Sequence, residues 1–498
     1  MQLKCPYPCV AFHIAVNPMS YKLRTILLPS LLFISCSLFS QEIWTLERCI
    51  TYANENNITI RQAKANVRTA ALTKQQAKES RLPSLRANVD FGEQFGRTID
   101  PTSNQFSTEA TSFSSIGLSG GVNVFSGGII NHSIKQANWN LQAAIADAER
   151  SINDLGLLIA SAYLNILLSE EQLNNAGKRV EQSQAQLATT QKLIDAGTAP
   201  AAEKFNLLAQ VARDEQIAVQ ARNNVDLAYL TLKQYLQLEP DYNLQVQRPD
   251  ILVPADARPE EASLTALYQT ALTTQPGIRA AGFRVNSAKE GIAIAKSAYY
   301  PTLSVFANLN SSYSSRFLDF QNGTIVRQDT ISAGSFLVNG QPLNIQAVND
   351  VYSFPKLGYF NQIDRNFGQG FGISLGIPIY QNGRTRLSVE RARLGALTAE
   401  MQQTQTQQTL KNDIQTAIAN ARAAKRQLDA AQKTFDASSI AYQNTEKRLA
   451  LGAVNTLDLT TSKNNRDIAE NDLVVARYDY LFKLKILDFY AGRPLKLD

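Results

Sequence analysis

Residues 117–128 read GLSGGVNVFSGG, and residues 372–383 read GISLGIPIYQNG. In both stretches small and apolar residues alternate, an aromatic residue follows, and a glycine ends the run. Alternation with a period of two is typical of a β-strand, and each glycine is followed by a long stretch without proline, as expected for a helix. The repeated junction predicts a chain that contains the same strand-to-helix unit twice.

The chain aligns with itself over nearly its whole length. Residues 46–85 align with residues 264–303 at an offset of 218, and from Gly117 onward the offset is 255. The difference, 255 − 218 = 37, places one insertion between Pro301 and Gly372 of the second copy. Such self-similarity indicates an internal duplication. Each copy is predicted to hold a helix, two strands, a very long helix, a tight turn and a returning helix.

The predicted strands are about as long as a tilted strand that crosses a bilayer. They cover residues 83–91, 116–124, 301–312 and 371–379. In the second of them, Ile116, Leu118, Val122 and Val124 are expected on one face. Any one run would also suit a half-buried strand of a soluble sheet. Four strands cannot close a membrane barrel, and lipid does not tolerate an open edge, so membrane strands would require a barrel shared by a dimer or a trimer.

The predicted long helices carry apolar residues at alternating steps of three and four, which is the spacing of supercoiled helices. A helix over residues 129–195 would be on the order of 100 Å long at 1.5 Å per residue. Each helical pair is closed by a turn that contains Gly197 or Gly452. Glycine ends one helix in such turns, Pro200 is expected to open the next, and Thr456 is the expected N-cap in the second copy.

Residues 1–40 are predicted to be a signal peptide, in which residues 1–18 form an extension before a start at Met19. The mature chain is expected to begin at Gln41, and lipidation of Cys36 is the alternative. Cys49 is then the single cysteine of the predicted mature chain, and it is expected to be a buried apolar side chain. No apolar run of helix-spanning length is expected after residue 40.

The duplication also divides the chain. The first repeat is expected over residues 41–238 and the second over residues 263–498, and a proline-rich linker over residues 239–262 joins them. The insertion forms a long loop over residues 313–366, opposite a shorter one over residues 97–112 in the first copy. Both loops are expected to be extracellular.

Composition argues against several classes of protein. The formal charge of +6 falls to +3 without Lys4, Lys22 and Arg24 of the signal segment, and no basic patch with interleaved aromatic residues indicates a nucleic-acid partner. His132 is the single histidine after residue 40, and a lone histidine does not make a catalytic or metal site. Gly368, Gly370 and Gly372 have the wrong spacing for a phosphate-binding loop and suit a barrel strand better. The sequence therefore predicts no enzyme, no cofactor and no metal.

These features together resemble one family, the TolC-like outer membrane efflux proteins. The resemblance covers about residues 41–495 and rests on the duplication, the strand-to-glycine junctions, WTLERCITYANENN at 44–57, and the paired turns KLIDAGTAPAAEKF and KRLALGAVNTLDL. It implies a mixed α/β homotrimer with a shared twelve-stranded barrel in the outer membrane of a Gram-negative bacterium. It also implies a long periplasmic helical barrel whose tip meets an adaptor protein bound to an inner membrane pump of RND or ABC type. Small molecules such as drugs, or secreted proteins, would be the cargo.

The resemblance also implies roles for individual residues. Gly197, Thr198, Gly452 and Ala453 would contact the adaptor, and Glu203 and Asp458, each six residues after a turn glycine, would form the periplasmic constriction. The chain departs from the family pattern at three positions near the second turn. Val454 replaces a common arginine, Leu449 a tyrosine and Thr461 an acid, which puts the family's polar latch in doubt.

Two other classes of protein remain open from the residues. An exported coiled-coil tether of the cell envelope would explain the heptads but not the strands. A substrate-specific porin would need many more strands in each chain.

Overall fold

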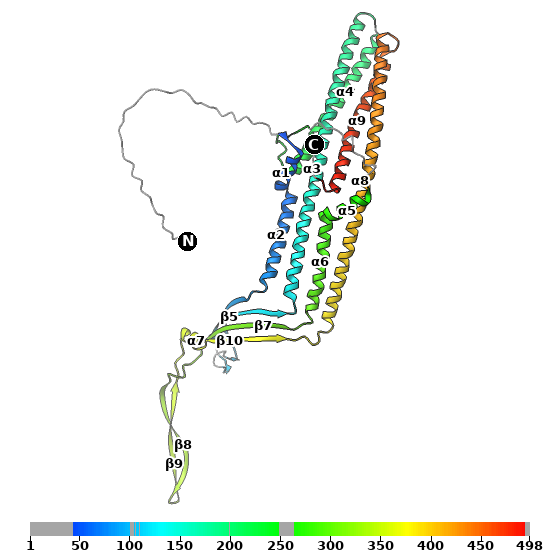
Figure 1. Cartoon of the computed structure of the whole chain (residues 1–498). Helices are drawn as coiled ribbons and strands as arrows, with labels where there is room; N and C mark the ends of the chain where they lie inside the picture. The colour runs from blue at the N-terminus through cyan, green and yellow to red at the C-terminus, as the bar shows by residue number, and fades with distance from the viewer. Residues whose placement is uncertain are drawn as a thin grey trace, which may run out of the picture. The chain divides into compact units, whose positions relative to one another are not determined.

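The computed structural model describes residues 43–99, 104, 106–108, 110–198, 200–248 and 263–493. The predicted signal segment, Cys36 and the start at Gln41 lie outside the described residues, as does most of the predicted linker. The described helices and strands follow the same order in both copies, apart from the insertion in the second (Figure 1).

The helices repeat at the offsets read from the sequence, which confirms the duplication. The first copy has α1 (Leu46–Asn56), α2 (Ile58–Glu79), α3 (Ile129–Asp195) and α4 (Ala202–Leu236). The second has α5 (Leu264–Thr274), α6 (Pro276–Ser297), α8 (Arg384–Ala450) and α9 (Thr456–Tyr490). The helices α3 and α8 each contain 67 residues.

The single helix predicted at the start of each copy is in fact two helices. Asn57 separates α1 from α2, since its side chain accepts a hydrogen bond from Thr59 N at 2.8 Å and donates one to Tyr235 O at 2.8 Å. In the second copy Pro276 is the first residue of α6, where its missing N–H costs no helical hydrogen bond.

Four long strands form one antiparallel sheet in the order β10-β7-β5-β2. They are β2 (Ser84–Gln94), β5 (Thr111–Ser126), β7 (Thr302–Ser314) and β10 (Gly368–Gly376). The strand predicted over 371–379 therefore begins three residues earlier and ends before Pro378, which has no N–H to donate to a ladder. The strands β2 and β10 are the two edges of this sheet.

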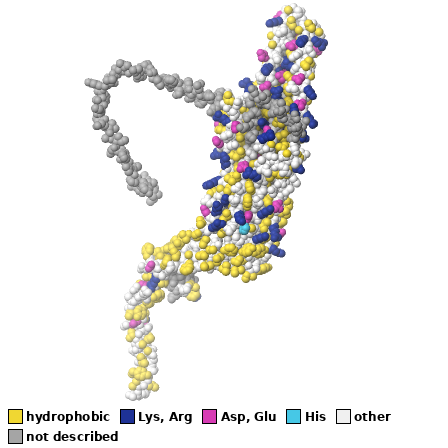
Figure 2. All heavy atoms as spheres, in the orientation of Figure 1, with side chains coloured by type: hydrophobic (Ala, Val, Ile, Leu, Met, Phe, Trp, Pro, Cys, Tyr) yellow, Lys and Arg dark blue, Asp and Glu magenta, His cyan; other side chains and the backbone are white. Residues whose placement is uncertain are grey.

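One face of the sheet is apolar, and Figure 2 shows hydrophobic side chains gathered over this part of the molecule. The register aligns Val89 with Ile116, and Ile373 with Val305, on that face. The opposite face holds serines, asparagines and glycines together with Arg86 and Asp90. The placement predicted for Val124 was wrong, because a bulge shifts the register and Phe125 is the residue that pairs with Leu303.

The glycines of β10 make room for side chains of β7. A Cβ at Gly372 would lie 2.6 Å from Phe306 Cζ, and one at Gly370 would lie 2.7 Å from Asn308 Oδ1. Gly368 faces Asn310 in the same way. These glycines therefore belong to a packed strand, as the sequence predicted.

The strand-to-helix junctions have the same backbone in both copies. Gly127 and Gly128 have φ of +63° and +88°, and Asn382 and Gly383, at the offset of 255, have φ of +47° and +70°. Two successive left-handed residues turn the chain out of the strand segment before α3 and α8 begin. At Gly127 the fold also excludes a side chain, because a Cβ would lie 2.4 Å from Ser297 O.

The insertion of the second copy contains regular structure rather than the plain loop that was predicted. It forms a ribbon of two antiparallel strands, β8 (Thr324–Val338) and β9 (Gln341–Ser353), followed by α7 (Tyr359–Arg365). Asn339 and Gly340 join the strands with φ of +49° and +80°, values that suit a type I′ turn. The first copy has only the short pair β3 (Thr98–Ile99) and β4 (Phe106–Ser107) at the matching place.

Beside the sheet, α2, α3, α6 and α8 lie next to one another in that order, and farther from the sheet α3 and α8 pack against α4 and α9 (Figure 1). The largest core joins α1, α3 and α4 around Cys49, Ile159 and Leu232, all fully buried. Next to this core, β1 (Ile43–Trp44) pairs with β6 (Gln245–Val246).

The expectation that no apolar run of spanning length follows residue 40 was wrong. By length and composition, α3 contains an 18-residue stretch that is apolar enough to cross a membrane. Half of this stretch is buried inside the chain. Leu155, Ile159, Tyr163 and Ile166 belong to the core just described. The Tyr163 hydroxyl lies 2.6 Å from Gln247 O, and burial raises its pKa. This stretch of α3 is therefore the centre of a helical core.

Candidate functional site

The turn between α3 and α4 is exposed, and backbone hydrogen bonds within it cap the end of α3. The Gly197 N–H donates to Ile194 O and the Thr198 N–H to Leu193 O, both at 2.9 Å, and Gly197 has φ of +74°. This Schellman motif satisfies carbonyl groups at the end of α3. The Thr198 hydroxyl adds a second bond of 2.9 Å to Leu193 O.

The turn between α8 and α9 repeats this motif. The Gly452 N–H donates to Leu449 O and the Ala453 N–H to Arg448 O, again at 2.9 Å. The predicted cap at Thr456 was wrong by one residue, because Asn455 is the N-cap of α9. Its side chain accepts from Asp458 N at 2.9 Å, and Asp458 Oδ2 accepts from Asn455 N at 3.4 Å, which makes a capping box.

Thr456, which was predicted to be the N-cap, connects the two turns instead. Thr456, the first residue of α9, donates from its hydroxyl to Glu203 Oε2 of α4 at 2.9 Å. Glu203 therefore lies beside the second turn, whereas Asp458 is exposed and bonded within its own turn. Within the described part of the tip, no hydrogen bond or ion pair joins these two acids. Leu449 and Val454 are half-buried, and neither supplies a polar group of the kind the family's latch uses.

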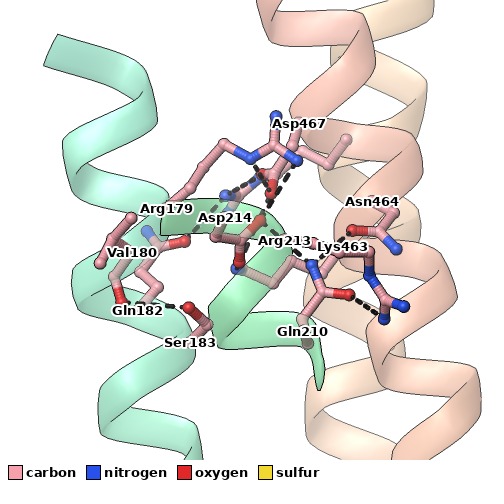
Figure 3. Close-up of polar contacts among 11 residues, drawn as sticks. Arg179, Val180, Gln182, Ser183, Gln210, Arg213, Asp214, Lys463, Asn464 and Asp467 are labelled. Carbon is pink, nitrogen blue, oxygen red and sulfur yellow. Dashed lines mark hydrogen bonds and ion pairs between the residues drawn. The ribbon is translucent and has the colours of Figure 1, made fainter. Parts of the chain in front are cut away.

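A second polar group lies farther along the same helices, where α3, α4 and α9 meet (Figure 3). Arg179 Nε lies 3.2 Å from Asp467 Oδ2, and its Nη2 lies 3.6 Å from Asp214 Oδ1. Lys463 Nζ lies 3.9 Å from Asp214 and 3.8 Å from Asp467. Arg466 completes the group with a contact of 2.6 Å to Asp467 Oδ1. We call these five residues the buried ion network.

The network is almost closed to water and carries more positive than negative charge. The side chains of Asp214 and Asp467 are fully buried, and three cations face these two acids. Burial lowers the pKa of Lys463 despite the attraction of Asp467 and Asp214. The Arg466 guanidinium also lies 4.6 Å from the ring centre of Tyr442, so the network ties α9 to α3, α4 and α8.

Sequence reasoning missed this network, although the signal is present. Asp214 stands seven residues after buried Leu207 and seven before buried Ala221, so it occupies a position of the apolar seam. Lys463 and Asp467 follow buried Leu459 at steps of four. Charged residues on a heptad seam indicate a polar contact between helices.

The comparisons with known proteins decide the family. The outer membrane efflux protein family matches residues 49–237 and 267–493. The chain belongs to this family.

Its relatives match nearly the whole chain. Outer membrane protein TolC of Escherichia coli is 26% identical over 474 residues, which are 91% of this chain and 84% of the relative. The outer membrane efflux protein BepC of Brucella suis is 21% identical over 447 residues, 88% and 84% of the two chains. The crystal structure of the Campylobacter jejuni CmeC outer membrane channel superposes with a TM-score of 0.70 at 16% identity, covering 91% of this chain and 87% of that one.

Membership in the efflux family shows which part of the channel the sheet forms and which part the helices form. The four-stranded sheet is one third of a twelve-stranded outer membrane barrel shared by three chains, and the long helices continue it as a helical barrel in the periplasm. The assembly is the outer membrane channel of a tripartite export system, and channels of this family are homotrimers that work with adaptor and pump partners. The relatives are channel proteins, and the coiled-coil tether is not favoured.

Proposed function

We propose that the two helical turns form the periplasmic entrance of this channel, and that Glu203 and Asp458 are its charged constriction. A trimer brings three copies of each acid to one narrow mouth. Like charges within a Debye length of about 8 Å at physiological salt repel one another and concentrate cations. The entrance should therefore favour cations and bind multivalent cations that bridge carboxylates.

One observation carries this proposal. The bond of 2.9 Å from Thr456 to Glu203 holds the start of α9 against the start of α4, so the acids of both copies belong to one tip. Leu449 and Val454 do not supply the family's polar latch. This bond, the ring of acids and apolar packing would then keep the entrance closed.

We assign the exposed turns at Gly197, Thr198, Gly452 and Ala453 to the periplasmic adaptor. The support is their small side chains and their backbone hydrogen bonds, because each Schellman turn satisfies two carbonyl groups at the end of its helix. The adaptor would connect the channel to an inner membrane pump of RND or ABC type. The cargo would be small molecules such as drugs and toxic compounds, or secreted proteins.

We place the loops over residues 97–112 and 313–366 outside the cell. The helices leave the sheet at the Gly127–Gly128 and Asn382–Gly383 junctions, and both loops leave from the other ends of the strands. If the helices are periplasmic, the loops are extracellular. The apolar face of the sheet would contact outer membrane lipid.

Conductance of the purified trimer in planar bilayers tests the constriction. The pair Glu203→Gln and Asp458→Asn removes both charges but keeps oxygen atoms that accept from Thr456 and from the Asn455 N–H. We expect weaker cation selectivity and relief of block by trivalent cations. The matched control is Glu215→Gln, an exposed acid twelve residues farther along α4, or about 18 Å at 1.5 Å per residue.

The control should leave both properties unchanged. If the double variant also keeps selectivity and block, the two acids serve only as helix caps and as partners of the favourable helix dipole, worth roughly 0.3–1 kcal/mol each. The constriction would then lie elsewhere.

A further inference from the structure

The outer half of the β8–β9 ribbon is unusual for an exposed hairpin because it carries no charge. Residues 330–349 contain no Asp, Glu, Lys or Arg. The three charged residues of the two strands, Arg327, Asp329 and Asp350, all stand closer to the base of the ribbon.

The uncharged half has one markedly apolar face. Ile331 is opposite Ala347, and Phe336 is opposite Leu343. A bulge at Ala333 keeps Gly334 and Ile345 on the same face. We define the apolar ribbon face as the six side chains that share it: Ile331, Phe336, Val338, Leu343, Ile345 and Ala347.

The opposite face is more polar. There Ser332 is opposite Gln346, and Ser335 is opposite Asn344. The pairs on either side of these two are Thr330 with Val348 and Leu337 with Pro342. Five of the six members of the apolar ribbon face are exposed, Phe336 by 48% and Leu343 by 56%, although the ribbon has only two strands. A ribbon of two strands is marginally stable unless its apolar face packs against another layer.

The base of the ribbon is firmly attached to the sheet. Gln362 of α7 is buried, donates to Ser314 O at 2.9 Å and to Leu357 O at 2.7 Å, and accepts from Ser314 N at 2.9 Å. Asp319 accepts from Asn322 Nδ2 at 2.6 Å and from Arg365 Nη1 at 3.2 Å. The ribbon therefore leaves the sheet from a fixed platform at the ends of β5 and β7.

We propose that the three ribbons of the trimer pack against one another through the apolar ribbon face, forming a collar over the outer opening of the channel. The inference rests on the proposed extracellular position of the insertion. The occupant of the apolar ribbon face is a second copy of the same face.

Three observations favour a second copy over another partner. The platform is continuous with the sheet that the three chains share, so three identical ribbons rise around one barrel. Their uncharged outer halves can approach one another without like-charge repulsion, which a charged segment repeated around an axis could not avoid. Mutual packing also covers apolar surface that would otherwise promote aggregation.

Disulfide formation in the full-length trimer tests the collar. Phe336→Cys places a thiol on the apolar ribbon face, and Leu337→Cys, the next residue, places one on the opposite face. We expect mild oxidation to link Phe336→Cys chains into dimers, because one disulfide joins two of the three thiols, and Leu337→Cys to link several-fold less. Ile345→Cys is a second probe of the apolar ribbon face and should behave like Phe336→Cys.

Cys49 does not interfere, because it is fully buried and burial raises the pKa of its thiol to about 12. A membrane-impermeant maleimide should label Leu337→Cys on intact cells. If Leu337→Cys is labelled on intact cells but both faces link equally, or neither face links, the collar is overturned and the proposed function is left intact. Absence of label on intact cells would overturn the extracellular position, and the collar with it.

Discussion

Gly127 shows most clearly how a single residue fixes this architecture. Its φ of +63° is disfavoured for residues with a side chain, and a Cβ would approach Ser297 O to 2.4 Å. Its counterpart in the second copy, Asn382, has φ of +47° with a full side chain. Asparagine adopts this conformation more readily than most residues. The two junctions thus share one backbone conformation. At Gly127, however, the end of α6 also leaves no room for a side chain.

Exchanging the residues of the two junctions should therefore have unequal effects. Gly127→Asn adds a side chain against Ser297 and should cost roughly 1–3 kcal/mol of stability, from overpacking against the end of α6. Asn382→Gly should change stability by less than about 1 kcal/mol. Thermal unfolding of the detergent-solubilised protein measures both. Equal shifts would show that the contact with Ser297 does not matter.

Among the elements, the buried ion network fixes α9 against α3 and α4. Its charges are unbalanced, since Arg179, Lys463 and Arg466 face Asp214 and Asp467. Removing one partner of a buried pair usually leaves an uncompensated charge. Burial lowers the pKa of Lys463 even beside two acids, so the charge of this lysine is the one we remove to balance the network.

We therefore expect opposite results from two apolar substitutions. Asp467→Leu leaves three cations facing one acid and should cost about 3–5 kcal/mol of stability. Lys463→Met leaves two arginines with two aspartates and should be neutral or stabilising. Melting followed by circular dichroism separates these outcomes, and a large loss with Lys463→Met would contradict the charge balance.

The pH dependence of Lys463→Met has a definite sign. A lysine whose pKa is lower in the folded state opposes folding at neutral pH, and this cost disappears as the pH rises through the folded pKa towards the unfolded value. Any advantage of Lys463→Met over the natural chain should accordingly shrink as the pH is raised into the alkaline range. An advantage that grows with pH would contradict the claim that the charge of Lys463 opposes folding.

The sequence predicted the elements that repeat, because a duplication shows every helix and strand twice. It did not predict the β8–β9 ribbon, although Asn339-Gly340 between alternating apolar residues is a strong hairpin signal. That segment has no second copy to compare. The Thr456–Glu203 bond and the ion network join helices far apart in the sequence, and the spacing of residues along one helix does not determine such contacts.

At the scale of the whole molecule, one chain has open edges that only other chains can close. Among the described strands, β2 and β10 each have one edge without a partner strand, and the apolar face of the sheet is exposed on β10, where Phe371 is 92% exposed. An open edge is not tolerated in lipid, so the sheet requires neighbouring copies. Three four-stranded sheets complete the twelve-stranded barrel of the outer membrane efflux family.

The mass of the native particle tests this central claim most directly. Outer membranes would be washed with high salt and extracted with detergent, and the particle would be weighed by native mass spectrometry. We expect the protein to stay in the membrane through the salt wash and to leave it with detergent as a complex of three chains. Release by salt as a single chain would contradict the shared barrel.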